Sequence, residues 1–394
     1  MMGALDGLLL IPGILFLAAV GYLWFLAVVS LRPETGKRRE YPPTVTFAVV
    51  IPAHNESRVI ARTLESLLAS DYPRDRFEVF VIADNCDDDT AAVARRSGVI
   101  CWERKDSENR GKGYVLRWAF DRLLQEGGHD AFVVIDADTV ADRRFLRAVN
   151  DRLCGGAQAV QGYYDVLHPE RSPMGSLSYL GFMISRNLRY RGRTRLGWTT
   201  NLLGNGMAFS REVIARFGWC ATSIVEDIEY EMILHLNGIR VAFAPEARIY
   251  AEIPDTFRTS RVQRGRWDVG KFEVRNQYVF QLLKSWVRTR DFSYLDSALE
   301  LLIPPFSLFV ALILAGTPAV LLLTGLSGWA GPVWVTAFLG VGGYTLLGLM
   351  LARPHPRVYV NLLYAPYFIL WRIWVVFRGM VSGTRHVWVK TERR

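Results

Sequence analysis

Two aspartates directly after an apolar run are the first candidates for chemistry in this sequence. Residues 132–135 (FVVI) are all apolar, and Asp136 and Asp138 follow them. Such a run is typical of a strand that is buried on both faces, and open α/β sheets bind ligands beyond the carboxyl ends of these strands. Two carboxylates there suit Mg²⁺ or Mn²⁺ that bridges the phosphates of a nucleotide. The alternative is an ordinary turn, in which aspartate is common.

Two other predicted strands also end in polar residues. Segments 46–52 and 77–83 have the composition of buried strands, and the sequences AHNE and DNCDDD follow them. At the same sheet edge, Glu56 and Asp84 are suited to accept hydrogen bonds from the NH or OH groups of a base and a ribose. The aspartates at 87–89 fit better as caps of a helix that begins at Thr90.

A basic glycine-containing loop, RGKG at residues 110–113, opens the next predicted helix. Backbone NH groups at a helix N-terminus can bind phosphate together with the ammonium group of Lys112. The loop lacks the G-x-x-x-x-G-K-[ST] spacing of a Walker loop. A solvated basic loop without a ligand is the alternative interpretation.

Glu226 and Asp227 stand at the start of an amphipathic helical pattern over 227–236. Acidic residues are common at helix N-termini, and capping alone would explain them. The second interpretation is catalytic, because transfer of a sugar to a hydroxyl group needs a general base. A carboxylate beside a metal-bound nucleotide is the natural candidate for that base.

The sequence QRGRW at residues 263–267 has the spacing Q-x-x-R-W. Its arginines can neutralise a diphosphate leaving group through charge-assisted hydrogen bonds, and Trp267 offers a flat apolar face to a sugar ring. The alternative is an interfacial tryptophan with arginines that extend toward lipid head-groups, since apolar segments lie nearby.

The periodicity of the chain predicts the scaffold that would bring these groups together. Strand-like and helix-like segments alternate from residue 44 to about 250, which indicates a mostly parallel sheet with helices on both faces. The predicted strands are 46–52, 77–83, 99–103, 132–135, 157–164, 239–244 and a short strand within 204–210. The predicted helices are 56–69, 90–96, 113–125 and 227–236.

The composition is too apolar for an ordinary soluble enzyme, with 51% hydrophobic residues concentrated toward the two ends. The net charge of +9 comes largely from arginine near those ends. It favours a membrane surface with anionic lipids or phosphate-bearing substrates over nucleic acid. The four cysteines share no metal-ligand spacing, which is consistent with free thiols in a reducing compartment.

Three apolar segments, 8–31, 299–326 and 333–351, are long enough to cross a bilayer. Basic residues follow the first and the third, so both of these ends are predicted to be cytoplasmic and the N-terminus external. Residues 360–380 are apolar but contain Arg372 and Arg378. We expect an interfacial or re-entrant segment, because a simple span would carry the basic tail 385–394 outside.

These patterns divide the chain into four regions. They are an N-terminal transmembrane helix (1–31), an α/β domain (44–262), an interfacial amphipathic segment with the Q-x-x-R-W pattern (263–295) and a C-terminal membrane region (296–394). The last region comprises two spans, the interfacial segment and the basic tail.

In their order, seven motifs resemble those of the family-2 glycosyltransferases with a GT-A fold. They are VVIPAHNES, VIADNCDDDT, NRGKGYVL, VIDADT, GNGMAFS, VEDIEYE and QRGRW, spread over residues 48–267. They are most similar to the membrane-bound subgroup of cellulose, chitin-oligosaccharide, hyaluronan and poly-N-acetylglucosamine synthases. Val225 replaces the threonine usual before Glu-Asp, and Asn85 stands where many members carry a second acid. The chain has about three full spans, fewer than cellulose synthase, which puts a self-contained polymer channel in doubt.

The resemblance implies a role for each matching residue. Ala53, Glu56, Asp84, Lys112 and Asp136 would bind the nucleotide, and Asp138 with Asp136 would coordinate Mg²⁺ or Mn²⁺. Asp227 would be the catalytic base. Asn205, Gly206, Glu226, Gln263, Arg264, Arg266 and Trp267 would bind the acceptor and the pyrophosphate.

The implied function is that of an inverting, metal-dependent hexosyltransferase in the cell membrane with its catalytic domain in the cytosol. It would transfer a sugar from a UDP-linked hexose or N-acetylhexosamine to a growing β-linked polysaccharide or oligosaccharide. One alternative is the transfer of a single sugar to a lipid acceptor, which the short membrane region favours. An alternative outside this class is a transporter or receptor with a nucleotide-binding domain, although the intramembrane charges a transporter would use are scarce.

Overall fold

The computed structural model describes residues 3–33, 39–253 and 257–382 of the 394-residue chain. The basic positions 37 and 38 and the basic tail 385–394 therefore lie outside the described residues. The side chain of Arg378 is also outside the description.

A mixed sheet forms the centre of the α/β domain. Its order among the described residues is β3-β2-β1-β4-β7-β6-β8-β5. The strands are β1 (Phe47–Ala53), β2 (Phe77–Asp84), β3 (Ile100–Arg104), β4 (Ala131–Val134), β5 (Thr139–Ala141), β6 (Ala159–Val166), β7 (Met207–Ser210) and β8 (Val241–Ala251). β3, β2, β1 and β4 run parallel, as do β6 and β8, while β7 is antiparallel to both of its neighbours. The predicted α/β class with a mostly parallel sheet is confirmed.

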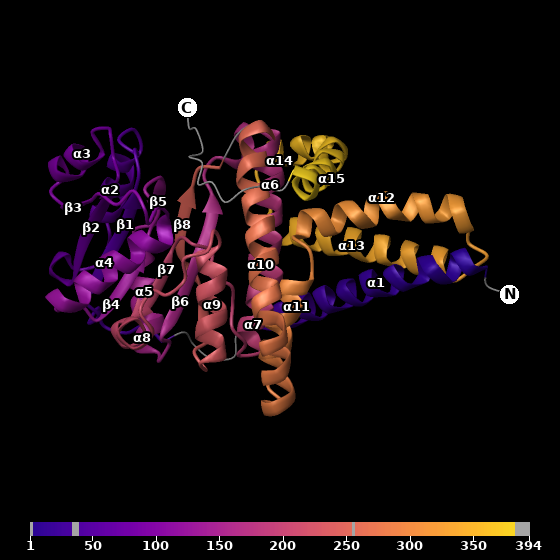
Figure 1. The fold of residues 1–394 in the computed structure, drawn as a ribbon, viewed down its shortest axis with the longest axis horizontal. Helices are drawn as coiled ribbons and strands as arrows, with labels where there is room; N and C mark the ends of the chain where they lie inside the picture. Colours follow the sequence, from indigo (N-terminus) through magenta and orange to yellow (C-terminus); the bar gives the residue numbers. More distant parts are fainter. Residues whose placement is uncertain (1–2, 34–38, 254–256, 383–394) are drawn as a thin grey trace.

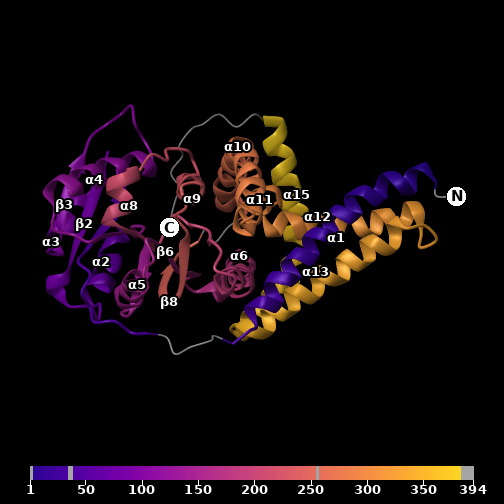
Figure 2. The ribbon, with the colours of Figure 1, turned by 90° about the horizontal axis from the view of Figure 1, so that it is seen from below.

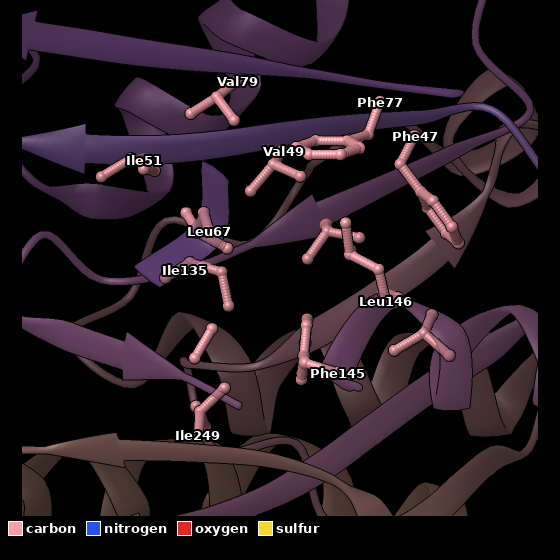
Figure 3. Packing of buried hydrophobic residues seen from close by; sticks show 14 of the residues in the cluster. Phe47, Val49, Ile51, Leu67, Phe77, Val79, Ile135, Phe145, Leu146 and Ile249 are labelled. Atoms are coloured by element: carbon pink, nitrogen blue, oxygen red, sulfur yellow. The ribbon is translucent and has the colours of Figure 1, made fainter. Parts of the chain in front are cut away.

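Helices cover both faces of this sheet (Figure 1). One face carries α2 (Ile60–Leu68), α3 (Thr90–Arg96) and α5 (Phe145–Cys154), and the other carries α4 (Lys112–Glu126), α8 (Arg211–Phe217) and α9 (Glu226–Leu236). Side chains of β1 alternate between the two cores: Phe47, Val49 and Ile51 pack with α2 and α5 (Figure 3), whereas Ala48 and Val50 pack with α4. This double burial explains why the central strands are apolar without a break.

Three long helices lie side by side and project from the domain (Figures 1 and 2). They are α1 (Ala4–Ser30), α12 (Phe306–Thr324) and α13 (Ala330–Ala352). Each is long and apolar enough to cross a membrane, and so is the segment Pro356–Val375. The predicted second span, 299–326, is wrong at its start. Pro304 and Pro305 separate α11 (Phe292–Leu302) from α12, because proline lacks the NH group that a continuing helix needs.

Two further helices cross the direction of this bundle. α10 (Phe257–Thr289) runs across the bundle in Figure 1 and lies between the domain and the bundle. α15 (Ala365–Ser382) follows α14 (Pro356–Asn361) and the short η4 (Leu362–Tyr364), and it also runs across the bundle (Figure 2). The interfacial or re-entrant placement of residues 360–380 stays a prediction, because the segment Pro356–Val375 is also long and apolar enough to cross a membrane.

A helical segment that the sequence analysis did not assign joins the domain to the bundle. It comprises α6 (Pro173–Ile184), the π-helical η3 (Ser185–Tyr190) and α7 (Arg191–Arg195), preceded by η2 (Pro169–Arg171). α7 passes so close to α1 that Gly192 leaves no room for a side chain against the Leu26 carbonyl. Buried arginines interrupt the apolar stripe of this segment, so its periodicity is hard to recognise.

Candidate functional site

A cavity of about 960 Å³ lies beyond the carboxyl ends of β1, β2 and β4. It extends from these strand ends past α9 and α10 to α6, α12 and α15. The predicted site residues that line it are Ala53, Glu56, Asp84, Lys112, Asp136, Asp138, Glu226, Asp227, Gln263, Arg264, Arg266 and Trp267. Residues from 53 to 267 therefore converge on one cavity.

The loops after β1 and β2 are fastened to each other. The NH of Glu56 donates to the Thr90 hydroxyl over 2.8 Å, which keeps Glu56 in a turn, so α2 begins at Ile60 rather than at residue 56 as predicted. Asp88 accepts from the NH groups of Thr90 and Ser57. Burial alone would raise the pKa of Asp88, but these hydrogen bonds lower it to about 2. This supports the capping interpretation for Asp88.

Asp84 is held by an arginine that sequence reasoning missed. Arg104 at the end of β3 donates to the Asp84 carboxylate over 2.6 Å, and both side chains are buried. β3 and β2 are parallel neighbours, so their last residues, Arg104 and Asp84, lie in register. Asp84 lines the cavity with its orientation fixed by this ion pair.

Lys112 is the first residue of α4 and donates to Asp136 over 2.5 Å and to the carbonyl of Gly204. Burial alone would lower its pKa, but the carboxylates of Asp136, Glu226 and Asp227 outweigh burial and raise it. Lys112 is thus a permanent positive charge between the aspartate pair and the acidic start of α9.

The donor set at Asp136 and Asp138 fits a divalent cation that completes its shell with phosphate oxygens. Both carboxylates line the cavity, and Asp138 is buried. No group of three or more His, Cys, Asp or Glu side chains arranged to hold a metal occurs in the described part of the chain. Mg²⁺ characteristically uses one or two carboxylates together with substrate phosphates and water.

The acceptor-side role expected of Asn205 and Gly206 is not supported by their positions. Neither residue lines the cavity, and the Asn205 side chain is fully buried. Its oxygen accepts from the NH of Asp136 over 3.1 Å, and its nitrogen donates to the Thr139 hydroxyl. Gly206 has φ of +67° and lies against Ile249. These residues hold the Asp136 turn in place, because the loop runs beside the end of β4 and the NH of Gly206 donates to the Val134 carbonyl over 2.9 Å.

Glu226 and Asp227 form the first residues of α9 and face the cavity. Neither caps the helix in the predicted way, since Val225 occupies the capping position. Burial raises the pKa of Asp227, while the NH of Ile228 and the charge of Lys112 oppose this shift. Burial and the neighbouring Asp227 also raise the pKa of Glu226. A carboxylate with a raised pKa is a better proton acceptor than a solvated aspartate.

The Q-x-x-R-W residues lie in the first half of α10. Trp267 lines the cavity and is 41% exposed, so part of its ring can contact a ligand. The Nε of Arg266 is buried and has no hydrogen-bond partner among the described residues. Arg264 donates to the hydroxyls of Ser178 and Ser260, and burial together with Arg372 lowers its pKa to about 10. Arg266 is therefore the better candidate of the two arginines for binding diphosphate.

The end of the cavity next to α6, α12 and α15 contains residues that the sequence analysis did not assign to the site. Phe182, Phe306 and Phe368, from α6, α12 and α15, form apolar walls there. Arg372 makes two 2.7 Å contacts with Asp268 of α10, which ties α15 to the cavity. The only early signal was Arg372 itself, since a charge in an apolar segment commonly marks a functional position.

Comparison with known sequences agrees with this geometry. The chain is 26% identical over 275 residues to the "Probable glycosyltransferase YdaM" of Bacillus subtilis, which covers 67% of this chain and 63% of that one. It is 25% identical over 279 residues to the poly-β-1,6-N-acetyl-D-glucosamine synthase of Staphylococcus aureus, covering 68% and 65%. The matched part is thus less than two thirds of the length of these curated relatives.

One solved structure shares the whole arrangement. The mannosyltransferase PcManGT from Pyrobaculum calidifontis, in complex with GDP-Man and Mn²⁺, matches with a TM-score of 0.59 at 18% identity. The match covers 97% of this chain and 99% of that one, so it includes the helices outside the sheet. The family described as "Glycosyltransferase like family 2" matches residues 42–270, more than half of the chain. This protein therefore belongs to the family-2 glycosyltransferases.

Proposed function

We propose that this enzyme transfers a sugar from a nucleotide-sugar to an acceptor hydroxyl at the cytosolic surface of a membrane, with inversion at the anomeric carbon. The observation that carries the proposal is the single cavity in which Asp84, Asp138, Asp227 and Trp267 meet. Its strand-end part has the groups that a nucleoside diphosphate needs, and its α9 end has the groups that an acceptor hydroxyl needs.

The nucleotide would occupy the end of the cavity formed by β1, β2 and β4. Glu56 and Asp84 can accept hydrogen bonds from the nucleoside, beside Ala53 at the end of β1. Asp138, with Asp136, would hold Mg²⁺ or Mn²⁺. When bound, the cation supplies positive charge against the departing diphosphate. Arg266 adds charge from the opposite wall through its unpaired Nε.

Asp227 is the proposed base, and Glu226 its neighbour on the acceptor side. Gly204, with φ of +73°, allows its loop to pass within van der Waals reach of the Asp227 carboxylate. Asp227 would remove the proton from the acceptor hydroxyl as its oxygen attacks the anomeric carbon from the face opposite the diphosphate. The C–O bond to the diphosphate breaks in the same step, and the proton remains on Asp227.

The geometry favours an acceptor that is anchored in the membrane. The inner part of the cavity is lined by phenylalanines of α6, α12 and α15, and α12 is one of the helices suited to cross a membrane. A polar acceptor head at Asp227 could thus be continuous with an apolar tail beside these helices. We propose that α1, α12 and α13 span the cell membrane and that α10 and α15 lie along its cytosolic surface.

Elongation of a polysaccharide is the second candidate. Two observations favour it: the exposed ring of Trp267 in the Q-x-x-R-W segment, and the relative named as a poly-β-1,6-N-acetyl-D-glucosamine synthase. The length of the product formed by purified protein from labelled donor distinguishes the candidates, since one transfers a single sugar and the other builds a ladder. The family match favours either of them over a transporter or receptor.

The proposal is tested by a donor screen with purified full-length protein. UDP- and GDP-sugars are incubated with Mn²⁺ or Mg²⁺ and membrane lipid extract, and the released nucleoside diphosphate is measured. We expect one donor class to be used and activity to disappear with a chelator. Absence of metal-dependent release from every donor would contradict the proposal.

Asp227→Asn is expected to reduce transfer by at least about 10²-fold, because the base is lost while the side chain keeps its size. Binding of nucleotide with Mn²⁺, measured by calorimetry, should remain near that of the wild type. Glu226→Gln serves as the discriminating variant. If Glu226→Gln loses transfer and Asp227→Asn retains it, Glu226 is the base instead.

A further inference from the structure

A second cavity, of about 470 Å³, lies where the membrane helices meet the domain. Ser30 and Arg32 at the end of α1, Leu351 at the end of α13, Tyr179 of α6 and Arg191 of α7 are among its lining residues. We call it the juxtamembrane pocket. Its size falls within the range of about 300–1,000 Å³ that is usual for small-ligand sites. Among the described residues, none that lines the active-site cavity also lines this pocket.

The juxtamembrane pocket is strongly basic. Four arginines line it, contributed by the α1 end, α7 and β8: Arg32, Arg191, Arg195 and Arg248. Among the described lining residues, Asp165 is the one carboxylate. Asp165 is buried, and its oxygen accepts from the NH of Val166, so it is turned partly to its own backbone. The excess of guanidinium groups favours an anionic ligand, and guanidinium matches phosphate in geometry as well as in charge.

The position of the pocket selects the kind of anion. α1 and α13 both end at it, on the side of the bundle that faces the domain (Figures 1 and 2). Leu351 and Met183 supply apolar wall beside the arginines. A pocket at the level where apolar helices end, with basic and apolar walls together, matches a lipid whose head-group is anionic and whose chains remain in the bilayer.

We propose that the juxtamembrane pocket binds the phosphate-bearing head-group of an anionic membrane lipid, with Arg191, Arg195 and Arg248 around the phosphate. The site joins α1, α7, α13 and β8, so an occupied pocket links the membrane helices to the sheet. It is separate from the sugar-transfer chemistry and does not depend on the donor or the acceptor of that reaction.

The experiment uses the full chain in neutral detergent, with phosphatidylglycerol added in increasing amounts and bound lipid counted by native mass spectrometry. Arg191→Gln/Arg248→Gln is compared with Arg96→Gln/Arg216→Gln, which removes the same charge from exposed positions on α3 and α8. Each basic residue near a membrane surface contributes about a fivefold factor, so the pocket variant should bind phosphatidylglycerol about thirtyfold more weakly. The α3/α8 variant should bind as the wild type does.

Two further arms make the outcome decisive. In the first arm, glycerol 3-phosphate replaces the lipid. If it saturates the juxtamembrane pocket at the same concentrations as phosphatidylglycerol, the ligand is a soluble anion and the lipid assignment is overturned. Equal weakening in the pocket and α3/α8 variants would overturn the site. Should the double variant fail to elute as a single species, Arg191→Gln alone tests the site, because Arg191 is exposed and an about fivefold loss is expected.

Discussion

Three carboxylates can lie close together in the active-site cavity because the positive charge of Lys112 lies among them. Asp136, Glu226 and Asp227 lie near one another in the cavity, and burial together with the charges of the neighbouring carboxylates raises the pKa of Glu226 and of Asp227. Lys112 donates directly to Asp136 and also acts on the α9 pair. The basic loop at residues 110–113 was predicted to bind phosphate. Through Lys112 it also favours the ionised form of Asp227, the proposed base.

This role predicts a particular dependence of rate on pH. Asp227 acts as a base only when it is deprotonated, and burial raises its pKa, so activity should fall on the acid side at a higher pH than an ordinary aspartate would give. Lys112→Gln removes a charge that favours the ionised form, so its acid limb should move upward by about one pH unit. The measurement is kcat against pH at saturating donor.

Arg110→Gln is the matched control, since it removes a positive charge from the same cavity wall without the contact to Asp136. Its acid limb should stay near that of the wild type. If Lys112→Gln lowers kcat uniformly at every pH, Lys112 acts in donor positioning alone and not on the ionisation of Asp227.

Among the helices and strands, the bounds predicted from sequence are most accurate where a single physical cause determines the local structure. β1, β2 and β4 are buried on both faces, and their apolar runs located them to within one or two residues. The predicted bounds of α3 match the observed ones, because acidic residues typical of a helix start directly precede its helical pattern. The site residues on these elements followed, because parallel strands deliver their ends to one edge.

The prediction failed where distant contacts decide the local structure. α6 to α7 bury arginines as well as apolar side chains, so their partners, on α1 and α11, had to be known first. The GNG loop was assigned to the acceptor, but Asn205 is required by the backbone of Asp136. In the apolar run 299–326, Pro304 and Pro305 indicate a kink, but the sequence does not distinguish one kinked helix from the two helices observed.

One helix contact outside the domain can be tested in isolation. The carboxylate of Asp6 on α1 accepts from the NH groups of Trp329 and Ala330, at 3.1 Å each, and so caps the start of α13. Asp6→Ala leaves these NH groups unpaired and should destabilise the protein by about 1 kcal/mol. The measurement is the unfolding temperature in neutral detergent. Asp6→Asn retains one acceptor oxygen and should lose less; equal stability of Asp6→Ala and wild type would contradict the cap.

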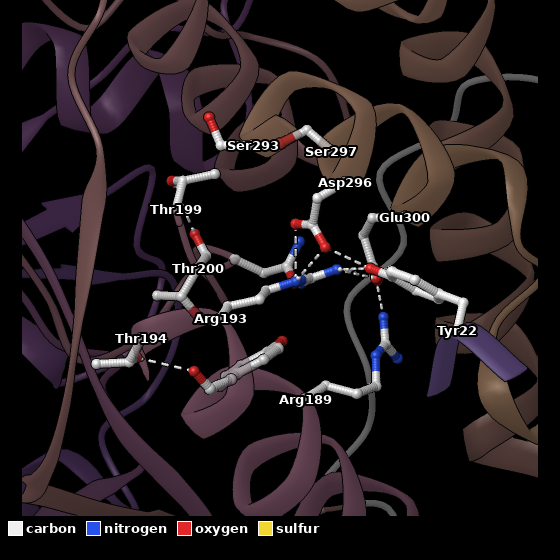
Figure 4. Close-up of polar contacts among 12 residues, drawn as sticks. Tyr22, Arg189, Arg193, Thr194, Thr199, Thr200, Ser293, Asp296, Ser297 and Glu300 are labelled. Atoms are coloured by element: carbon white, nitrogen blue, oxygen red, sulfur yellow. Dashed lines mark hydrogen bonds and ion pairs between the residues drawn. The ribbon is translucent and has the colours of Figure 1, made fainter. Parts of the chain in front are cut away.

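Across the whole molecule, a buried polar cluster connects α7 to α11 and to α1 (Figure 4). Arg193 of α7 contacts Asp296 at 2.9 Å and Glu300 at 2.8 Å, both on α11, and donates to the hydroxyl of Tyr22 on α1. It also donates to Asn201 over 2.5 Å. The guanidinium group of Arg189 also forms an ion pair with Glu300.

The cluster continues to α9, the helix that carries Asp227, the proposed base. Asn201 donates to Glu231 on α9, and the NH of Leu202 donates to the same carboxylate over 3.0 Å. Glu231 lies one helical turn beyond Asp227, on the same side of α9. The position of α1 is therefore connected, through Arg193 and Asn201, to α9, which carries Asp227.

Arg193→Met is the prediction at this scale. Removing one partner of a buried ion pair leaves carboxylates without compensation and typically costs about 3–5 kcal/mol. We expect a large loss of thermal stability in neutral detergent, whereas Arg143→Met, which breaks an exposed pair with Asp71, should change stability by less than about 0.5 kcal/mol. Arg193→Met/Asp296→Asn leaves Arg189 paired with Glu300 and restores neutrality, so it should recover part of the loss.

The recovered variant also tests the connection to the active site. If Arg193 positions α9, Arg193→Met/Asp296→Asn should fold and bind nucleotide with Mn²⁺, yet transfer sugar more slowly, because Asn201 has lost the partner that orients it toward Glu231. A purely structural role would instead return kcat together with stability. Arg193→Met no less stable than Arg143→Met would show that the long apolar helices and the α/β domain are held together by other contacts, such as the apolar packing of α1 against η3.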